Sequence, residues 1–276
     1  NSFQVDYVDW VDERAALSSD DLLAFLSPVR DVTDAEMDVI ADFTAGGGSI
    51  LFTCDFADPI DDMPNYAALL RSYGFEPKAG VVLASPEEPE TYYNDVRMML
   101  IPVMQETDIT VNLLLNGADT LLLAGSRAFA LPQEGDRNLV TEAVLTTSYK
   151  AYLRDLSDGG MSIDQSGDDE LGPFALALQA RRVTETGDVS RAFALGASTL
   201  LTDVQIHAMT DSQEFIIRVA EYLLNTEPMD LGIVAKAAVR PRLSARSVSL
   251  GSVALVGLPL LVLGAALLVL LPRRKK

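Results

Sequence analysis

The sequence has very few of the side chains that enzymes most often use for catalysis or metal binding. It contains one cysteine, Cys54, and one histidine, His207, among 276 residues. A single cysteine cannot form an intrachain disulfide, and a chain without clustered histidines and cysteines lacks the usual ligands of zinc. The sequence therefore predicts neither a disulfide-stabilised domain nor a bound metal.

Glycine-rich phosphate-binding motifs are absent as well. No G-x-x-x-x-G-K-[ST] sequence occurs, so we expect no P-loop ATP hydrolysis by this chain. The run Gly46-Gly47-Gly48 precedes a strand-like segment instead of lying between a strand and a helix. We interpret it as the end of a helix and predict no nucleotide cofactor.

Basic residues are scarce in the front part of the chain. Only 13 of the 21 lysines and arginines precede Lys236, whereas all 40 acidic residues lie at or before Asp230, so this part has a formal charge of −27. Nucleic-acid binding needs a basic surface for the phosphates. The charge distribution therefore argues against nucleic acid as a partner.

One long stretch carries no charge at all. Residues 249–271 are 23 uncharged positions, which form a helix of about 34 Å, and the hydrocarbon core of a bilayer is about 30 Å thick. We predict a transmembrane helix, since the alternative, a buried core helix, rarely lacks a polar face over this length. The candidates for helix packing within it are Gly257, Pro259 and Gly264.

Basic residues flank this stretch on both sides, where we expect them to contact lipid headgroups. Four lie on each side, so their number does not decide the orientation, but the denser tail favours a cytoplasmic C-terminus and an exported body. The alternative is a tail-anchored protein with a cytoplasmic body. The headgroup candidates are Lys236, Arg240, Arg242, Arg246, Arg273 and Arg274.

Strand and helix patterns alternate along the body. The apolar run 21–26 is followed by a helix with Thr33 as N-cap and Glu36 as its capping-box partner, and then by a buried-type strand at 49–54. This order is typical of a parallel βαβ unit. Helices are also predicted at 64–73 and 213–225, and strands at 3–10, 80–84, 119–124, 139–147, 174–182 and 191–197.

These patterns predict an α/β fold with a mostly parallel sheet flanked by helices, Rossmann-like or amidotransferase-like, plus one C-terminal transmembrane helix. The predicted organisation is an acidic extracytoplasmic domain, a basic juxtamembrane linker, the membrane helix and a basic cytoplasmic tail. These correspond to residues 1–229, 230–248, 249–271 and 272–276.

Four polar residues follow predicted strands and are candidates for a binding site at the edge of the sheet. Asp55 and Asp58 follow the strand at 49–54, and Ser198 and Asp203 follow the strand at 191–197. The carboxyl ends of parallel strands are the usual place for such sites. The alternative is ordinary turn chemistry, because aspartate and serine also favour turns.

Two further patterns resemble a catalytic cysteine and a calcium-binding loop, but each lacks residues that the function requires. Cys54 ends a strand, as the nucleophile of an amidotransferase-like hydrolase would, yet it has no flanking G-x-C-x-G elbow and lies beside two aspartates. Asp164, Ser166 and Asp168 resemble the start of a calcium loop, but Asp169 stands where glycine is required. We therefore interpret the loop as solvated and Cys54 as a small core residue.

Several segments together resemble the GldG-type family of ABC-transporter auxiliary proteins. The longest is DLLAFLSPVRDVTDAEMDVIADFTAGGGSILFTCD, residues 21–55. The hydrophobic run with its Arg/Lys tail resembles the C-terminal end of the family's sequences. The later matching segments, in order, are Leu145-Thr146-Thr147-Ser148, Gly172-Pro173-Phe174, LGASTLLTD at 195–203, EFIIRVAEYLLN at 214–225 and Leu243-Ser244.

The resemblance implies a non-catalytic accessory subunit in the bacterial cytoplasmic membrane, next to an ABC-2-type permease and a separate P-loop ATPase. The chain departs from the family in lacking its N-terminal span and upstream domain. The family supplies no catalytic residues to transfer. The alternative function is a membrane-tethered amidotransferase-like hydrolase that uses Cys54.

Overall fold

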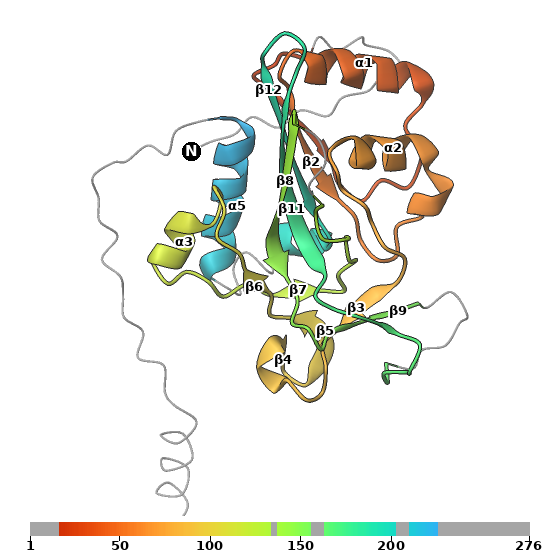
Figure 1. Cartoon of the computed structure of the whole chain (residues 1–276), viewed down its shortest axis with the longest axis vertical. Coiled ribbons are helices and arrows are strands. Elements are labelled where there is room, and N and C mark those ends of the chain that lie inside the picture. Colours follow the sequence, from red (N-terminus) through yellow and green to blue (C-terminus); the bar gives the residue numbers. More distant parts are fainter. Residues whose placement is uncertain (1–16, 134–136, 156–162, 203–209, 226–276) are drawn as a thin grey trace, which may run out of the picture. The chain divides into compact units, whose positions relative to one another are not determined.

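The computed structural model describes residues 17–133, 137–155, 163–202 and 210–225 (Figure 1). The chain divides into two compact units, residues 1–229 and 230–276, and every described residue belongs to the first. The predicted strand at 3–10 lies outside the described residues, as do the predicted linker, membrane helix and tail.

A six-stranded mixed sheet forms the centre of the domain. Its strand order is β1-β2-β12-β11-β8-β6. The first three strands in this order are parallel to one another, whereas β12-β11, β11-β8 and β8-β6 are antiparallel pairs. The strands are β1 (Leu22–Phe25), β2 (Ser49–Thr53), β12 (Val189–Leu195), β11 (Ala175–Val183), β8 (Leu139–Thr146) and β6 (Val103–Met104).

The prediction of a mostly parallel, Rossmann-like sheet is wrong. Only residues 184–188 separate β11 from β12, and a parallel connection would need a dozen residues or more. The Thr184 N–H donates to the Asp188 carbonyl at 2.9 Å, and Gly187 has a φ of 89°, so the connection is a hairpin turn. The parallel arrangement is therefore confined to three strands.

The βαβ unit predicted near the start of the body is confirmed. β1 and β2 are parallel, and α1 (Asp34–Ala45) connects them. Thr33 is the N-cap of α1 and forms the predicted capping box with Glu36, which satisfies backbone N–H groups that the first helical turn leaves free. The helix ends at Gly46, at the predicted glycine run.

The second helix, α2 (Pro64–Ser72), begins with proline at its first turn and takes its cap from a distant loop. The Asp31 carboxylate accepts hydrogen bonds from the backbone N–H of Asn65 at 3.1 Å and of Tyr66 at 2.9 Å. A carboxylate at this position also interacts favourably with the helix dipole. The loop after β1 thereby fixes the start of α2.

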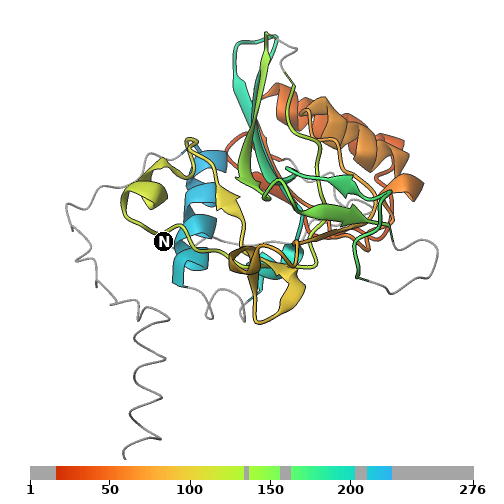
Figure 2. The same cartoon turned by 60° about the horizontal axis from the view of Figure 1, so that its bottom comes forward.

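Helices cover both faces of the sheet (Figures 1 and 2). α1 and α2 lie on one face, and α5 (Thr210–Leu223) lies on the other, near the short helix α3 (Val111–Leu115). Alternate residues of β2 serve the two faces: Ile50 and Phe52 are buried with α1 and α2, while Leu51 packs against the cluster that contains α5. The sheet therefore separates two hydrophobic cores.

Two three-stranded sheets and three 3₁₀ turns complete the described part. One sheet has the order β10-β9-β3 and the other β4-β5-β7. Their strands are β10 (Glu170–Leu171), β9 (Tyr152–Arg154), β3 (Val81–Leu83), β4 (Tyr92–Tyr93), β5 (Val96–Leu100) and β7 (Leu123–Ala124), and the turns are η1 (Ile60–Asp62), η2 (Pro89–Thr91) and η3 (Ser198–Leu201).

The predicted location in a membrane needs correction. Among the helices of the described residues, none combines the length and the apolar character needed to cross a bilayer. The longest of them, α5, has 14 residues, and a span requires about 20. The stretch 249–271, on which the prediction rested, lies outside the described residues.

Candidate functional site

The carboxyl ends of the three parallel strands meet at one edge of the sheet, which we call the rim. Ser27 follows β1, Asp55 follows β2, and Ser198 follows β12. The structure brings these three residues together, because both serine hydroxyls bond to the Asp55 carboxylate. The edge is the one at which parallel sheets usually place ligand sites.

Asp55 is the centre of the rim. Its carboxylate accepts hydrogen bonds from the Ser198 backbone N–H and hydroxyl, both at 2.5 Å, and from the Ser27 hydroxyl at 2.9 Å. These bonds compensate the half-buried carboxylate for lost hydration. Because its donors follow β1 and β12, Asp55 ties the ends of β1, β2 and β12 together.

Ser27 has a backbone conformation that non-glycine residues seldom adopt, with a φ of 45°. Its N–H donates to the Thr53 hydroxyl oxygen at 2.7 Å, and Thr53 in turn donates to the Phe25 carbonyl at 3.4 Å. These bonds link the end of β1 to the end of β2. They hold the Ser27 hydroxyl in reach of Asp55.

Arg127 is buried beneath the rim, with 5% of its surface exposed. Its guanidinium donates to the backbone carbonyls of Asp55, Phe56 and Asp58 at 2.7 to 3.1 Å, and to that of Lys78 at 3.0 Å. Four carbonyl acceptors satisfy most of its donors without an ion pair. Arg127 therefore fixes the path of residues 55–58.

Asp58 is the half-buried carboxylate next to Asp55. Its Oδ2 atom accepts the Asp55 backbone N–H at 2.7 Å. Burial raises the pKa of Asp58 above its usual value; the bond from Asp55 N–H lowers it, the charge of Asp55 raises it and Arg127 lowers it. The side chain still reaches solvent, as do the exposed Asp61 and Asp62 that follow it.

Cys54 is fully buried on the α2 side of β2, with its sulfur 3.6 Å from the Tyr66 hydroxyl oxygen. Burial raises the pKa of the thiol from 9.0 to about 12. A nucleophilic cysteine requires a lowered pKa and access to a substrate. Cys54 has neither, which supports its interpretation as a core residue.

The acidic loop that resembled a calcium site directs its carboxylates to basic side chains. Asp169 accepts from Arg154 at 2.9 Å, Glu170 pairs with Lys78 at 2.9 Å, and Asp164 pairs with Arg97 at 3.2 Å. Within the described residues, no group of carboxylates, histidines or cysteines is arranged to hold a metal ion. The loop is thus held by ion pairs to the neighbouring strands.

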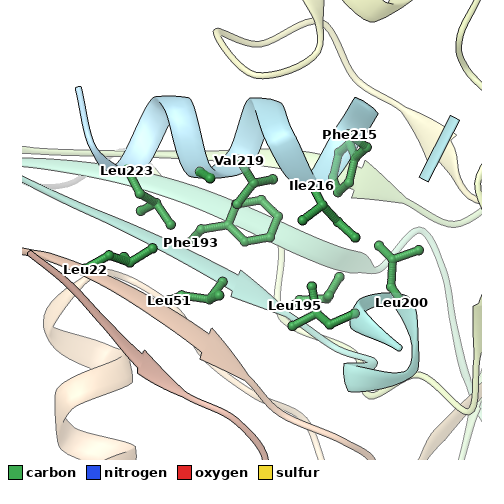
Figure 3. A pocket seen from close by; sticks show the side chains of 11 residues that line it. Leu22, Leu51, Phe193, Leu195, Leu200, Phe215, Ile216, Val219 and Leu223 are labelled. Atoms are coloured by element: carbon green, nitrogen blue, oxygen red, sulfur yellow. The ribbon is translucent and has the colours of Figure 1, made fainter. Parts of the chain in front are cut away.

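An apolar cavity of about 60 Å³ lies between α5 and the parallel half of the sheet (Figure 3). Leu22 and Leu51 line it from the sheet, together with Phe193 and Leu195. The other lining residues come from η3 and α5 and are Leu200, Leu201, Phe215, Ile216, Val219, Ala220 and Leu223. Because every lining residue is apolar, the cavity offers no group that would orient a polar ligand.

The structure describes three of the four rim residues that were predicted from the sequence. Asp55, Asp58 and Ser198 lie together, whereas Asp203 and the lone histidine, His207, lie outside the described residues. The predicted membrane-packing and headgroup residues also lie outside them: Gly257, Pro259, Gly264, Lys236, Arg240, Arg242, Arg246, Arg273 and Arg274.

Two rim residues were not predicted from the sequence. Ser27 follows a short apolar strand just as Asp55 does, so the rule that found Asp55 could also have found Ser27. Arg127 is the single charged residue in the apolar stretch 121–131. An isolated charge in such a stretch signals a buried group with dedicated partners.

Comparisons with known proteins identify no family for this chain. No protein-family model matches the sequence, and no curated protein matches it. Among solved structures, the mmIFT52 N-terminal domain is similar with a TM-score of 0.51 and 16% identity, over 74% of this chain and 76% of that chain. At this identity the similarity concerns the fold alone.

A second solved structure, a ThuA-like protein from Bacteroides uniformis ATCC 8492, has a TM-score of 0.42 and 12% identity. The match covers 75% of this chain and 70% of that chain. Its TM-score is too low to support an argument about the present chain.

Proposed function

We propose that this protein is a non-catalytic accessory subunit of an ABC-2-type transporter, and that its described domain binds a partner subunit or a substrate through the rim. The partners would be a permease and a separate P-loop ATPase. The GldG-type resemblance of the sequence motivates the transporter, and the geometry of the rim motivates the binding role. The whole chain has 40 acidic residues and only 21 basic ones, so we expect a basic surface on the partner.

The observation that carries the binding role is the closed hydrogen-bond network of Asp55. Its carboxylate already accepts three bonds, and two of these use the hydroxyls of Ser27 and Ser198. In these bonds the two hydroxyls join the ends of β1 and β12 to Asp55 at the end of β2. The network therefore favours a rigid surface over a reactive centre.

Asp58 is a partly exposed charge next to this network. Its neighbour Asp55 and the buried Arg127 fix the backbone of residues 55–58, while part of the Asp58 carboxylate faces solvent. A charge held on a rigid support is well placed to pair with a lysine or arginine of another chain. Asp61 and Asp62 extend the same acidic surface.

The alternative function, an amidotransferase-like hydrolase that uses Cys54, has little support. The thiol is fully buried and its pKa is about 12. Such a thiol is protonated at neutral pH and out of reach of a substrate. Among the described rim residues, the hydroxyls of Ser27 and Ser198 donate to Asp55.

The test is affinity purification of the full chain from cells that also produce its candidate permease and ATPase. We expect both subunits to co-purify reciprocally, and we expect Asp58→Lys to reduce their recovery. Asp38→Lys changes the same charge at an exposed position of α1 and is the matched control. Recovery of the chain alone, or ATP hydrolysis by the purified chain, would contradict the proposal.

A further inference from the structure

One part of the sheet face on the α5 side is open to solvent and carries two opposed arginines. Arg181 on β11 lies directly opposite Arg191 on β12 and opposite Val140 on β8. Residues directly opposite on neighbouring strands point to the same face, and Val183 shares it two positions further along β11. We call Arg181, Arg191, Val140 and Val183 the arginine patch; Figure 1 shows these strands continuing beyond α5.

Three of the four patch residues are exposed, and Arg191 is partly buried beside Tyr222. Val140 has 43% and Val183 47% of its surface accessible, and the side chain of Arg181 has 46%. Two exposed valines beside two arginines make a surface that is both apolar and positively charged. Such a surface suits a partner segment that has apolar and acidic side chains.

The arginines of the patch have weaker partners than most of the other basic residues that the structure describes. The nearest carboxylate to Arg181 is Asp108 at 3.8 Å, and Arg191 lies 5.9 Å from the centre of the Tyr222 ring. Among the described residues, neither guanidinium donates a hydrogen bond within 3.5 Å. By contrast, seven other basic residues each have a carboxylate within 3.2 Å: Arg30, Arg71, Lys78, Arg97, Lys150, Arg154 and Arg218.

This arrangement is unfavourable for the isolated domain. Like charges directly opposite on adjacent strands destabilise a sheet. The chain has 40 acidic residues and a net charge of −19, so carboxylates that would pair with these arginines are abundant. Glu142, the nearest acidic side chain on β8, accepts instead from the Gln179 amide at 2.8 Å.

We propose that the arginine patch is a docking surface for an acidic segment of a partner protein. Carboxylates of the segment bind the two guanidiniums in the bidentate geometry that arginine favours, and its apolar side chains cover Val140 and Val183. The opposed arginines are then stabilised by carboxylates that bind more closely than Asp108, which lies 3.8 Å from Arg181. The patch is separate from the rim, so this proposal stands or falls independently of the transporter function.

The test measures binding of a fluorescein-labelled peptide of Glu-Glu-Val repeats to the full chain by fluorescence anisotropy. The net charge of the chain repels this peptide, so binding reports a local basic surface. We expect R181E/R191E to raise the dissociation constant about tenfold or more. The control R71E/K150E makes the same charge change at two exposed residues outside the patch and should leave the constant nearly unchanged.

A second variant separates binding from folding. R191Q removes one of the opposed charges, so we expect the melting temperature to rise by about 1 to 4 °C while peptide affinity falls. A loss of affinity with a lower melting temperature would show that Arg191 is structural and would overturn the proposal. So would equal effects of the patch and control variants, or absence of peptide binding.

The other candidate to bind the arginine patch is a second copy of this chain, which is itself acidic. Sedimentation of the wild-type chain over a range of concentrations tests this. Self-association that is lost in R181E/R191E, together with no competition by the peptide, would overturn the proposal in favour of a homodimer. A monomer at all concentrations that binds the peptide supports the acidic partner.

Discussion

The two faces of the central sheet are packed in different ways. On the face of α1 and α2, aromatic rings surround Phe52: Phe25 is stacked at 5.8 Å, Tyr66 lies at 5.9 Å and Phe75 at 6.1 Å. On the face of α5, the contacts are mostly aliphatic and leave a cavity of about 60 Å³. The same strands thus contribute to one dense core and one incompletely filled core, and equal substitutions on the two faces should have unequal effects.

The largest effect is expected at β2, whose adjacent residues serve opposite faces. Phe52→Ala removes the ring at the centre of the aromatic core and should lower the free energy of unfolding by about 3–5 kcal/mol. Leu51→Ala, on the cavity side, should cost only about 1–2 kcal/mol because Leu51 is partly exposed and already borders the cavity. Urea denaturation of the two variants measures both values.

Equal losses for the two variants would remove the distinction between the faces. A Leu51→Ala loss that exceeds that of Phe52→Ala would reverse it.

A second effect is a pH dependence of the free energy of unfolding that comes from Cys54 on the dense face. Because burial raises the pKa of Cys54 from 9.0 to about 12, the folded chain holds this proton more tightly than the unfolded chain does. The free energy of unfolding should therefore be unaffected by this group below pH 9 and fall as pH rises toward 12, by at most about 4 kcal/mol.

Cys54→Ala removes this contribution, so its stability should fall less steeply than that of the wild type between about pH 9 and 11. Burial also raises the pKa of Tyr66, and this contribution remains in the variant. Denaturant titrations at several pH values compare the two slopes. Coincident slopes would mean that the thiol is not buried as described.

The smallest effect is expected when a side chain is enlarged instead of shortened on each face of the sheet. Ala194 is fully buried on the dense face, and Ala194→Val should destabilise the domain by about 1–3 kcal/mol through overpacking. Ala220 lines the cavity, and Ala220→Val should be neutral or stabilise the domain by up to about 1 kcal/mol. Thermal unfolding ranks the pair; destabilisation by both would indicate that the cavity has no room for two methyl groups.

Elements with local signals were predictable from the sequence. The capping box of Thr33 and Glu36 and the glycine end of α1 are confirmed, because the hydrogen bonds that define them join residues close in sequence. The amphipathic helix predicted at 213–225 corresponds to α5. Very short strands such as β4 and β6 have too few residues for a periodic pattern and were missed.

The direction of the buried strands was not predictable from their apolar composition. A fully buried strand has the same pattern in parallel and antiparallel sheets. The short connection between β11 and β12 does indicate their direction, because residues 184–188 are too few for a parallel crossover. The strand-end rule nevertheless placed Asp55 and Ser198 correctly in contact, because β2 and β12 belong to the parallel part.

Arg127 shows the limit of this reasoning at the rim. Its acceptors are the backbone carbonyls of Asp55, Phe56, Asp58 and Lys78, and a carbonyl gives no sequence signal. The contact also depends on Gly196, where a Cβ atom would collide with the Arg127 carbonyl oxygen. Such contacts arise only when distant segments meet, so they become visible only in the folded structure.

The cavity beneath α5 also makes this domain compressible on one side. Packing that leaves a gap between a helix and a sheet occupies more volume than the hydrated unfolded form, so hydrostatic pressure favours opening of the region around the gap. Amides of α5 should then exchange with solvent at lower pressure than those of α1 and α2. Mechanical compression would therefore loosen the helix of one face while the aromatic core of the other face still holds its strands together.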